Sequence, residues 1–527
     1  MAFTNASFTL TSAVELLKRH HLLREIITPE RWTISAEGLP GADAPIPAIT
    51  YDTRDVTPGS LLFVKGRFKP EFMDGIDERG LAVYVSETEF SDRTSAVGLI
   101  VEDAPKAMAL LSLEFYGRPD RQLKMVGITG TKGKTTTNYF THAILNAYSH
   151  GRAAITSSIA CCLDGSTWIP SKLTTPVSLD LARMMREAVD NGMEYFVMEV
   201  SSQAYKVNRV YDLTFDAGAF LNISPDHISP IEHPTFEDYL HCKRQIIAHS
   251  RRFVLGADCD HADLLREDAA AHNVPVFSFA LHDDTEGKRT AADLTVSPTA
   301  ETKTGITVSC AGETRTFTLD MLGEFNFLNA AAAIALAVNA GVPFDDDAMK
   351  AIESVQVPGH MERFTGGENL LVFVDFAHNY LSTKALVDEM MRVYGERDPR
   401  ITVVAGSTGG KAIDRREGIV KGALGRAESF VFTTDDPNFE DPQTICEQMA
   451  SYVTDDAQVR IITDRERAIV TAIGEAREHA DRFNIVLVIG KGHERRNIIN
   501  GAAVPWPGDA TIVRRELGDG PAGGETA

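Results

Sequence analysis

The 527-residue chain has little cysteine, and its cysteines are not spaced like metal ligands or a disulfide framework. None belongs to a CxxC pair or to a Cys/His pattern of metal-site spacing. Scattered cysteines of this kind are typical of proteins from a reducing compartment, so the pattern predicts a cytoplasmic protein. The six residues are Cys161, Cys162, Cys242, Cys259, Cys310 and Cys446.

Positive charge and long apolar runs are also scarce. The chain has 52 Lys and Arg against 74 Asp and Glu, which gives a net charge of -22 at pH 7. Such a charge argues against a general affinity for nucleic acid or acidic membranes, so local clusters must hold any anionic ligand. The chain has no run of about 18 apolar residues and no basic start followed by an apolar segment. We expect no nucleic-acid partner, no membrane insertion and no export.

One glycine-rich segment predicts a phosphate-binding loop. The stretch VGITGTKGKTTTNYF, residues 126–140, follows an apolar run at 123–128 and leads into apolar residues at helical spacing. Strand, glycine loop and helix together form the context that such a loop requires. The strict pattern has four residues between its first glycine and the Gly-Lys pair. Here Gly127 leaves five and Gly130 leaves two, so the loop is a variant.

The residue types in this loop suit a phosphate group. Gly130 and Gly133 would let backbone N–H groups and the helix dipole approach an anion. Lys134 would reach the outer phosphates, and Thr135 would meet a magnesium ion. The alternative is a glycine-rich turn with an exposed lysine.

Strand and helix patterns alternate along most of the chain, with glycine turns at strand ends. This alternation predicts an α/β protein with mostly parallel sheets covered on both faces. At this length we expect three domains, at residues 1–122, 123–356 and 357–527. The central domain would be of the P-loop ATPase type, and the C-terminal domain would be Rossmann-like.

Polar residues follow the predicted strands of the central domain. Glu199, Ser201 and Ser202 come after one strand, and Asp226 and His227 come after another. Open parallel sheets bind ligands at these strand ends, where a carboxylate beside a phosphate loop suits magnesium. The alternative for Glu199 is a carboxylate that caps the next helix.

Lys243 lies on an expected helix, on the same face as Tyr239 and Ile246 or Ile247. A lysine among apolar neighbours costs free energy unless it is paired or modified. The residues by themselves favour a solvated lysine.

Four strands of the C-terminal domain end in charged or glycine-bearing loops, which together indicate one polar cleft. Taken separately, each could be a solvated loop. These loops hold Asp375 and His378, residues 407–411, Asp435 and Asp436, and residues 491–494.

Ten motifs resemble, in order and approximate spacing, those of the Mur ligase family. The likeness covers nearly the whole chain, and YDTRDVTPGSLLFV is similar to that family's uridine-nucleotide-binding first domain. The motifs are GITGTKGKTTT, TTP at 174–176, MEVSS, NISPDH, TFEDYLHCK, GEFNFLNAAAA, VPGHMER, VDFAHN, TTDDPN and GKGHE.

The resemblance implies an ATP-dependent ligase of peptidoglycan synthesis. Within the family the motifs look like the branch that adds the third amino acid to UDP-N-acetylmuramoyl-L-alanyl-D-glutamate through an acyl phosphate. It implies ATP and Mg²⁺ as cofactors, a cytoplasmic location and a monomer. Rival functions are folylpolyglutamate synthesis, which needs no such first domain, and a regulator that binds ATP without forming an amide.

The resemblance also implies roles for single residues. Lys134, Lys243 and His378 would be catalytic. ATP would contact Gly130, Thr131, Gly133, Lys134, Thr135, Thr136, Asn326, Asn329 and Asp375. Magnesium would contact Thr135, Glu199, His227 and Lys243 as a carbamate, which reverses the preference for a solvated lysine. The UDP-muramoyl dipeptide would contact Thr53, Thr174, Thr175, Ser201 and Arg209. The amino acid would contact Lys411, Asp435, Asp436, Asn438, Gly490 and Glu494.

Some positions depart from the family pattern. His360 and Lys411 stand where arginine is common, and Phe376 replaces a usual tyrosine. These departures leave the roles of Lys411, Arg415 and Arg416 open.

The TTDDPN motif bears on the amino acid. Relatives that add diaminopimelate typically carry Asp-Asn-Pro-Arg, whose arginine pairs with the distal carboxylate of that substrate. Here Asp436 adds an anion and Asn438 removes the cation, so we expect L-lysine. L-ornithine is the closer competitor, because one methylene contributes only about 1 to 3 kcal/mol of discrimination. The alternative is that DDPN is merely a type I turn.

Overall fold

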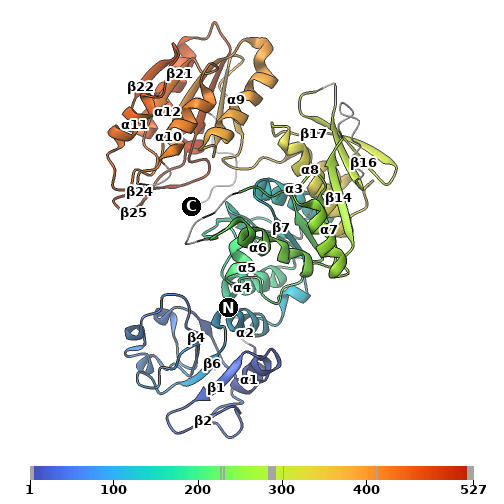
Figure 1. Ribbon diagram of the computed structural model, residues 1–527, viewed down its shortest axis with the longest axis vertical. Helices are drawn as coiled ribbons and strands as arrows, with labels where there is room; N and C mark the ends of the chain where they lie inside the picture. The colour runs from blue at the N-terminus through green and yellow to red at the C-terminus, as the bar shows by residue number, and fades with distance from the viewer. Residues whose placement is uncertain are drawn as a thin grey trace. The chain divides into compact units, whose positions relative to one another are not determined.

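The computed structural model describes residues 5–225, 228, 232–282, 292–300, 302–410 and 413–518 (Figure 1). The chain forms two compact units. The first comprises Met1–Ser297, Val308–Arg315 and Leu328–Ile352, and the second comprises Pro298–Thr307, Thr316–Phe327 and Glu353–Ala527. The expected boundaries after residues 122 and 356 stay predictions.

The first unit begins with a six-stranded sheet in the order β2-β1-β6-β5-β4-β3. Strands β3 to β6 run parallel, and β1 pairs antiparallel with β2 and β6. Helices α1 and α2 share one hydrophobic core with alternate strand residues such as Phe63 and Val85, whereas Leu62 and Tyr84 belong to the core on the other face. The elements are α1 Leu10–Arg19, β1 Leu23–Ile27, β2 Trp32–Thr33, β3 Ile49–Thr50, η1 Thr53–Asp55, β4 Leu61–Phe63, η2 Pro70–Met73, η3 Asp77–Arg79, β5 Val83–Ser86, β6 Val97–Val101, α2 Ala104–Phe115 and η4 Pro119–Arg121.

The second sheet has 11 strands in the order β10-β9-β8-β11-β7-β12-β13-β14-β15-β16-β17. The run from β8 to β15 is parallel, and β9 and β10 are antiparallel additions at one edge. The strands are β7 Lys124–Thr129, β8 Ala153–Thr156, β9 Ala160–Cys162, β10 Trp168–Pro170, β11 Tyr195–Glu199, β12 Ala217–Phe220, β13 Phe253–Gly256, β14 Val276–Leu281, β15 Leu294–Pro298, β16 Gly305–Cys310 and β17 Glu313–Thr318.

Strand β7 lies between β11 and β12, in the interior of this sheet. Its residues from Met125 to Thr129 are all buried, as expected for a parallel strand covered on both faces. Its carboxyl end therefore points into the region where ligands of such sheets bind. The helices of this part are α3 Lys134–Tyr148, α4 Ser178–Asp190, α5 Ser202–Lys206, α6 Phe236–Ala248, α7 Ala262–Ala271, α8 Phe325–Asn339 and η5 Asp347–Ser354.

The second unit has a six-stranded sheet in the order β18-β19-β23-β20-β21-β22, parallel except for β18, and a hairpin of β24 and β25. The sheet is covered on both faces (Figure 1): Phe373 of β19 belongs to a core with α9, α10 and α11, and Val372 and Val374 belong to a core with α12 and α13. The elements are β18 Glu362–Thr365, β19 Leu370–Asp375, α9 Tyr380–Tyr394, η6 Gly395–Arg397, β20 Arg400–Ala405, α10 Asp414–Ala423, β21 Ser429–Phe432, α11 Pro442–Ala450, β22 Gln458–Ile461, α12 Arg465–Glu478, β23 Asn484–Ile489, β24 Arg496–Ile499, β25 Ala502–Pro505 and α13 Asp509–Leu517.

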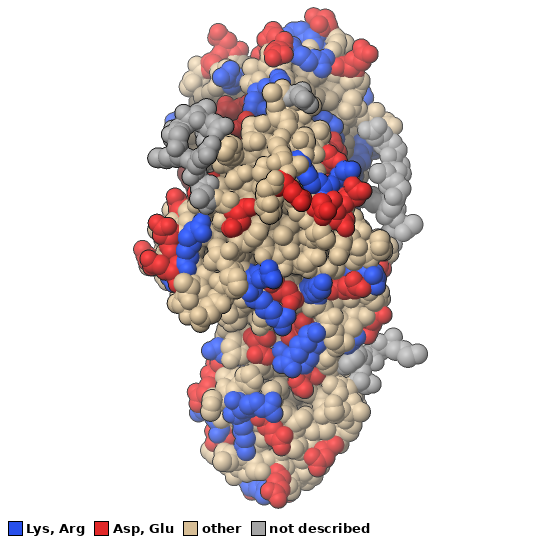
Figure 2. All heavy atoms as spheres, turned by 90° about the vertical axis from the view of Figure 1, so that its right-hand side faces the viewer, with Lys and Arg blue, Asp and Glu red and all other residues tan. Residues whose placement is uncertain are grey.

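The surface carries charges of both signs. On the face in Figure 2, Lys and Arg side chains lie among Asp and Glu side chains. Among the residues that the structure describes, no helix combines the length and the apolar character needed to cross a bilayer.

A buried ion pair stabilises the second unit. Arg465, at the start of α12, donates to both carboxylate oxygens of Asp509 on α13, at 2.9 and 2.7 Å. The same guanidinium donates to the carbonyl oxygen of Ile489, at the end of β23, at 2.9 Å. The two side chains are 1% and 0% exposed. The pair thus joins two helices to the carboxyl edge of the sheet.

We expect Arg465→Met to lower the free energy of unfolding by about 3 to 5 kcal/mol, because it leaves the Asp509 carboxylate buried without its counterion. The matched control is Arg515→Met, which removes a partner of Glu466 from an exposed pair and should cost about 0 to 1 kcal/mol. Urea unfolding followed by circular dichroism measures both. Equal midpoint shifts would contradict this assignment.

Candidate functional site

The glycine loop follows β7 and ends at α3. Gly133 has φ of +81°, and a Cβ atom there would lie 2.3 Å from Oδ1 of Asn329 on α8. Both the left-handed backbone and the close approach require glycine at this position. Asn329 therefore packs directly against the loop.

Two lysines reach one carbonyl of the loop. Lys134 Nζ donates to the carbonyl oxygens of Gly130 at 2.9 Å and Thr131 at 3.1 Å. Lys243 Nζ, from α6, donates to the same Gly130 oxygen at 2.7 Å. The side chains of two helices thus hold the loop.

Lys243 is only 1% exposed, so the expectation of a solvated lysine was wrong. Helix α6 packs against β7, and its Tyr239 ring lies 4.9 Å from Lys243 Nζ. The burial of Lys243 results from the packing of α6 on the sheet, which the spacing of residues along the helix alone does not predict.

Glu199 lies at the end of β11 and is fully buried. Its carboxylate accepts hydrogen bonds from the backbone N–H of Ser158 at 2.7 Å and from the Ser158 hydroxyl at 3.0 Å. Burial raises the pKa of Glu199, and the Lys134 ammonium opposes that shift. Its bonds go to Ser158 rather than to α5, which disfavours the helix-capping alternative. A buried carboxylate beside a phosphate loop fits a magnesium ligand.

Four residues assigned to the UDP-muramoyl dipeptide lie together beside Glu199. Thr175 Oγ1 donates to the Glu199 carbonyl at 2.9 Å and accepts from the Ser201 N–H at 3.0 Å. Arg209 donates to the Thr175 carbonyl at 2.9 Å. Thr174 accepts from Ser158, whose hydroxyl also bonds Glu199. The hydroxyl and cation cluster therefore continues the site of the glycine loop.

Thr53, the fifth of these residues, lies in η1, where its carbonyl accepts from Arg79.

Sequence reasoning missed Lys65, which follows the residues of β4. Burial lowers the pKa of Lys65, and the charge of Arg209 lowers it further. The pKa of Arg209 is likewise lowered by burial. An anionic ligand would stabilise the positive charges of these two neighbouring side chains. Lys65 Nζ also lies 4.4 Å from the ring centre of Tyr51, whose hydroxyl donates to Asp180 at 2.7 Å. The sequence feature that could have identified Lys65 is its position directly after the apolar run in LLFVKG.

In the second unit, Asp375 ends β19. Its two carboxylate oxygens accept from the N–H groups of Ala377 at 2.7 Å and Met361 at 2.8 Å. Burial raises the pKa of Asp375 to about 6 despite these bonds.

His378 Nδ1 lies 2.7 Å from the Phe376 carbonyl oxygen. Asn326 is buried and donates to the Leu322 carbonyl.

Three of the residues assigned to the amino acid lie around one ammonium group. Lys491 Nζ lies 2.9 Å from Asp436, 3.3 Å from Glu494 and 3.5 Å from Asp435. Burial would lower the pKa of Lys491, but the carboxylates outweigh it and raise that pKa. A Cβ atom at Gly490 would lie 2.5 Å from Asp435, so glycine is needed there.

Asn438 accepts from the Gly501 N–H at 2.9 Å and has φ of +54°. Asp436, the second residue of DDPN, has φ of +44°, whereas a type I turn needs about -60° there, so DDPN does not form that turn. Among the positions left open, Arg416 is buried and bonds both oxygens of Glu440, at 2.8 and 2.7 Å, which indicates a structural role. His227 and Lys411 lie outside the described residues.

Two family models match the chain: the Mur ligase middle domain at residues 128–337, and the Mur ligase, glutamate ligase domain at residues 359–492. The chain belongs to the Mur ligase family. It is therefore an ATP-dependent ligase that forms amide bonds, and the resemblance seen in its motifs is confirmed.

Relatives within the family match almost the whole chain. The UDP-N-acetylmuramyl-tripeptide synthetase of Bifidobacterium longum (strain NCC 2705) is 55% identical over 97% of this chain and 100% of its own length. The UDP-N-acetylmuramoyl-L-alanyl-D-glutamate--L-lysine ligase of Enterococcus faecalis (strain ATCC 700802 / V583) is 40% identical over 96% of this chain and 98% of its own.

A solved UDP-N-acetylmuramoyl-L-alanyl-D-glutamate--2,6-diaminopimelate ligase has the same fold. It superposes with a TM-score of 0.64 at 21% identity and covers 91% of this chain and 96% of its own. The α/β class predicted from strand and helix alternation is confirmed.

We expect Gly133→Ala to weaken ADP binding by about tenfold or more, because the left-handed backbone and the contact with Asn329 would together displace the loop. Gly151→Ala is the matched control: its φ is +90°, but nothing lies within 4 Å of the added methyl group. Isothermal titration calorimetry gives both affinities. If both variants bound ADP as the wild type does, the loop would not depend on this glycine.

Proposed function

We propose that this Mur ligase adds L-lysine to UDP-N-acetylmuramoyl-L-alanyl-D-glutamate as the third residue of the peptidoglycan stem peptide. The observation that carries the proposal is the continuous cluster from the glycine loop, through Glu199, to Thr175 and Arg209. It supports an ATP phosphate and a polar, anionic substrate next to each other. The high identity to a tripeptide synthetase over the full length supports the same substrate.

The reaction needs an activated carboxyl group, because a carboxylate has a poor leaving group. A carboxylate oxygen of the substrate attacks the γ-phosphorus of ATP, and ADP leaves. The amine then attacks the acyl carbon of the acyl phosphate, inorganic phosphate leaves, and the amine loses a proton. Lys134 neutralises phosphate charge, and the fixed loop supplies N–H groups, so catalysis rests on positioning and charge.

The residues proposed to bind the metal ion offer oxygen ligands, which suit magnesium. When bound, magnesium would neutralise phosphate charge. Glu199 and Thr135 are the described ligands in this proposal, since Glu199 is a buried carboxylate that interacts with Thr135. Lys243 as a carbamate would add an anionic oxygen. Its Nζ now lies 2.7 Å from the Gly130 carbonyl, so the carbamate oxygens would have to turn away from that carbonyl.

His378 is our candidate to accept the proton of the attacking amine. Donation from Nδ1–H to the Phe376 carbonyl assigns the lone pair of the ring to Nε2. Histidine has an ordinary pKa near neutrality, which suits proton transfer of this kind.

The amino-acid end of the proposal rests on charge. Asp435, Asp436 and Glu494 lie around the ammonium of Lys491, and the Arg465 guanidinium, which also acts on Asp435 and Asp436, is paired with Asp509. Among the described residues, the carboxylates therefore leave an excess of negative charge here. A substrate that ends in a lone ammonium complements this excess, whereas the distal carboxylate of diaminopimelate would add another anion. The excess favours a diamino acid with only one carboxyl group, and the choice between lysine and ornithine then depends on the length of the side chain.

We expect ADP release to require both the UDP-muramoyl dipeptide and an amino acid, and to be fastest with L-lysine. The assay compares L-lysine, L-ornithine and meso-diaminopimelate at equal concentration. A preference for diaminopimelate would refute the charge argument, and a preference for ornithine would correct only the length. ADP release without the dipeptide would favour a different nucleotide-dependent function.

Lys243→Ala should lose most ligase activity, because it removes the proposed carbamate. A small added carboxylate such as acetate should restore part of the activity by replacing the carbamate anion. Lys243→Met keeps the apolar stem and serves as a second variant. ADP formation measures the activity. Full activity of a folded Lys243→Ala protein, or no rescue in either variant, would contradict the carbamate.

A cytoplasmic monomer completes the proposal. All six cysteines are free thiols, five of them buried, as suits a reducing compartment. Light scattering of the purified protein would test the monomer.

A further inference from the structure

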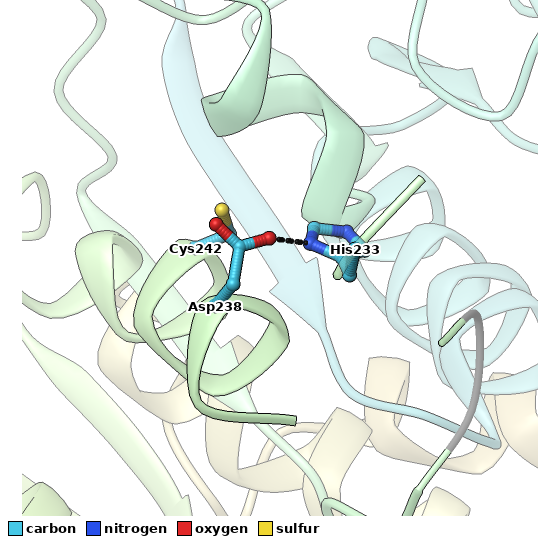
Figure 3. A group of neighbouring side chains, drawn as sticks. All are labelled: His233, Asp238 and Cys242. Carbon is cyan, nitrogen blue, oxygen red and sulfur yellow. Dashed lines mark hydrogen bonds and ion pairs between the residues drawn. The ribbon is translucent and has the colours of Figure 1, made fainter. Parts of the chain in front are cut away.

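Three side chains of different chemistry meet beside α6: His233, Asp238 and Cys242 (Figure 3). Their ligand atoms all lie within 4.8 Å of one another. Asp238 and Cys242 are four residues apart on α6, so they share one face of the helix, and His233 lies just before it. The roles proposed for the ligase reaction use none of the three.

The histidine ring is held from both sides. Its Nδ1 lies 2.6 Å from Asp238 Oδ2, and its Nε2 lies 2.8 Å from the Ser202 hydroxyl. The His233 side chain is fully buried. A metal-binding histidine usually fixes its second nitrogen by such a bond to an oxygen, so Ser202 provides what a metal ligand at Nδ1 needs.

We propose that His233, Asp238 and Cys242 bind a zinc-class divalent cation at a site chemically separate from the nucleotide magnesium. Imidazole nitrogen, thiolate and carboxylate are the three ligand types of zinc, whereas magnesium takes oxygen ligands. Zinc with one thiolate and one carboxylate has no net charge, which suits the burial of Cys242, 4% exposed. The cation takes the place of the proton between His233 and Asp238, and water completes the coordination.

The entrance to this site lies at Asp238, whose side chain is 31% exposed. Lys206 Nζ also bonds Asp238 Oδ2, at 2.6 Å, and its side chain is 29% exposed. The ammonium therefore competes with a metal ion, but its flexible chain can turn into solvent. Lys206 sets how tightly the cation binds.

A cation here would connect the segment before α6 to the first turns of that helix. Cys242 directly precedes Lys243, whose amine bonds the Gly130 carbonyl. Metal binding would thus stabilise the part of α6 that supports the glycine loop.

The experiment titrates the purified full-length protein with Co²⁺ in the presence of excess Mg²⁺ and ADP. We expect one equivalent of cobalt to produce the near-ultraviolet charge-transfer band of a thiolate ligand and the visible bands of a tetrahedral site. Cys242→Ser should abolish the near-ultraviolet band, and Asp238→Asn should weaken binding at least tenfold. Cys259→Ser is the matched control and should leave the spectrum unchanged.

Lys206→Met tests the competition. It should tighten cobalt binding by about tenfold, because it removes a neighbouring cation. Circular dichroism and ADP binding confirm that each variant is folded. The proposal is overturned if the wild type gives no thiolate band at micromolar cobalt, or if the band survives in Cys242→Ser. The spectra do not depend on which amino acid the ligase adds, so they test this site independently of the proposed reaction.

Discussion

One carbonyl oxygen organises the first unit. The oxygen of Gly130 accepts hydrogen bonds from the ammonium groups of Lys134, on α3, and Lys243, on α6. Nearby negative charge offsets the repulsion between two such cations, and the Glu199 carboxylate, at the end of β11, interacts with Lys134. Electrostatic interactions therefore add to the apolar packing that holds α3, α6 and β11 around the loop.

This arrangement explains why a lysine can be buried on α6. Desolvation of an ammonium costs several kcal/mol unless bonds replace its water, and the Gly130 carbonyl and the Tyr239 ring replace part of it. The remaining cost favours any change that removes the positive charge. Carbamate formation removes the cation but leaves an anion, which a bound magnesium ion could neutralise, so the proposed modification of Lys243 would depend on the metal. Phosphate binding would relieve the same excess of positive charge at Lys134.

The strand-end rule predicted that Glu199 and Asp375 lie at the ends of strands, because it needs only the alternation of apolar runs along the chain. The glycine loop was predicted from its glycines and from the strand and helix on either side of it. The sequence did not predict the burial of Lys243, because tertiary contacts decide which face of the helix packs on β7. For the same reason it did not predict that His233 lies close to Asp238 and Cys242. Lys65 could be recognised in the sequence as a lysine after a strand, but only the structure shows that it lies near Arg209.

Small residues, as well as charges, shape the amino-acid site. A Cβ atom at Gly406, after β20, would lie 2.7 Å from Cβ of Asp435, and one at Gly490, after β23, would lie 2.5 Å from its carboxylate. Asp435 thus packs closely between two strand ends where glycine leaves room for it. A rigid carboxylate recognises an ammonium by its distance along the substrate chain. If Asp435 binds the side-chain ammonium as proposed, length discrimination between lysine and ornithine would rest on the backbone packing around Asp435, whereas charge would discriminate only against a distal carboxylate.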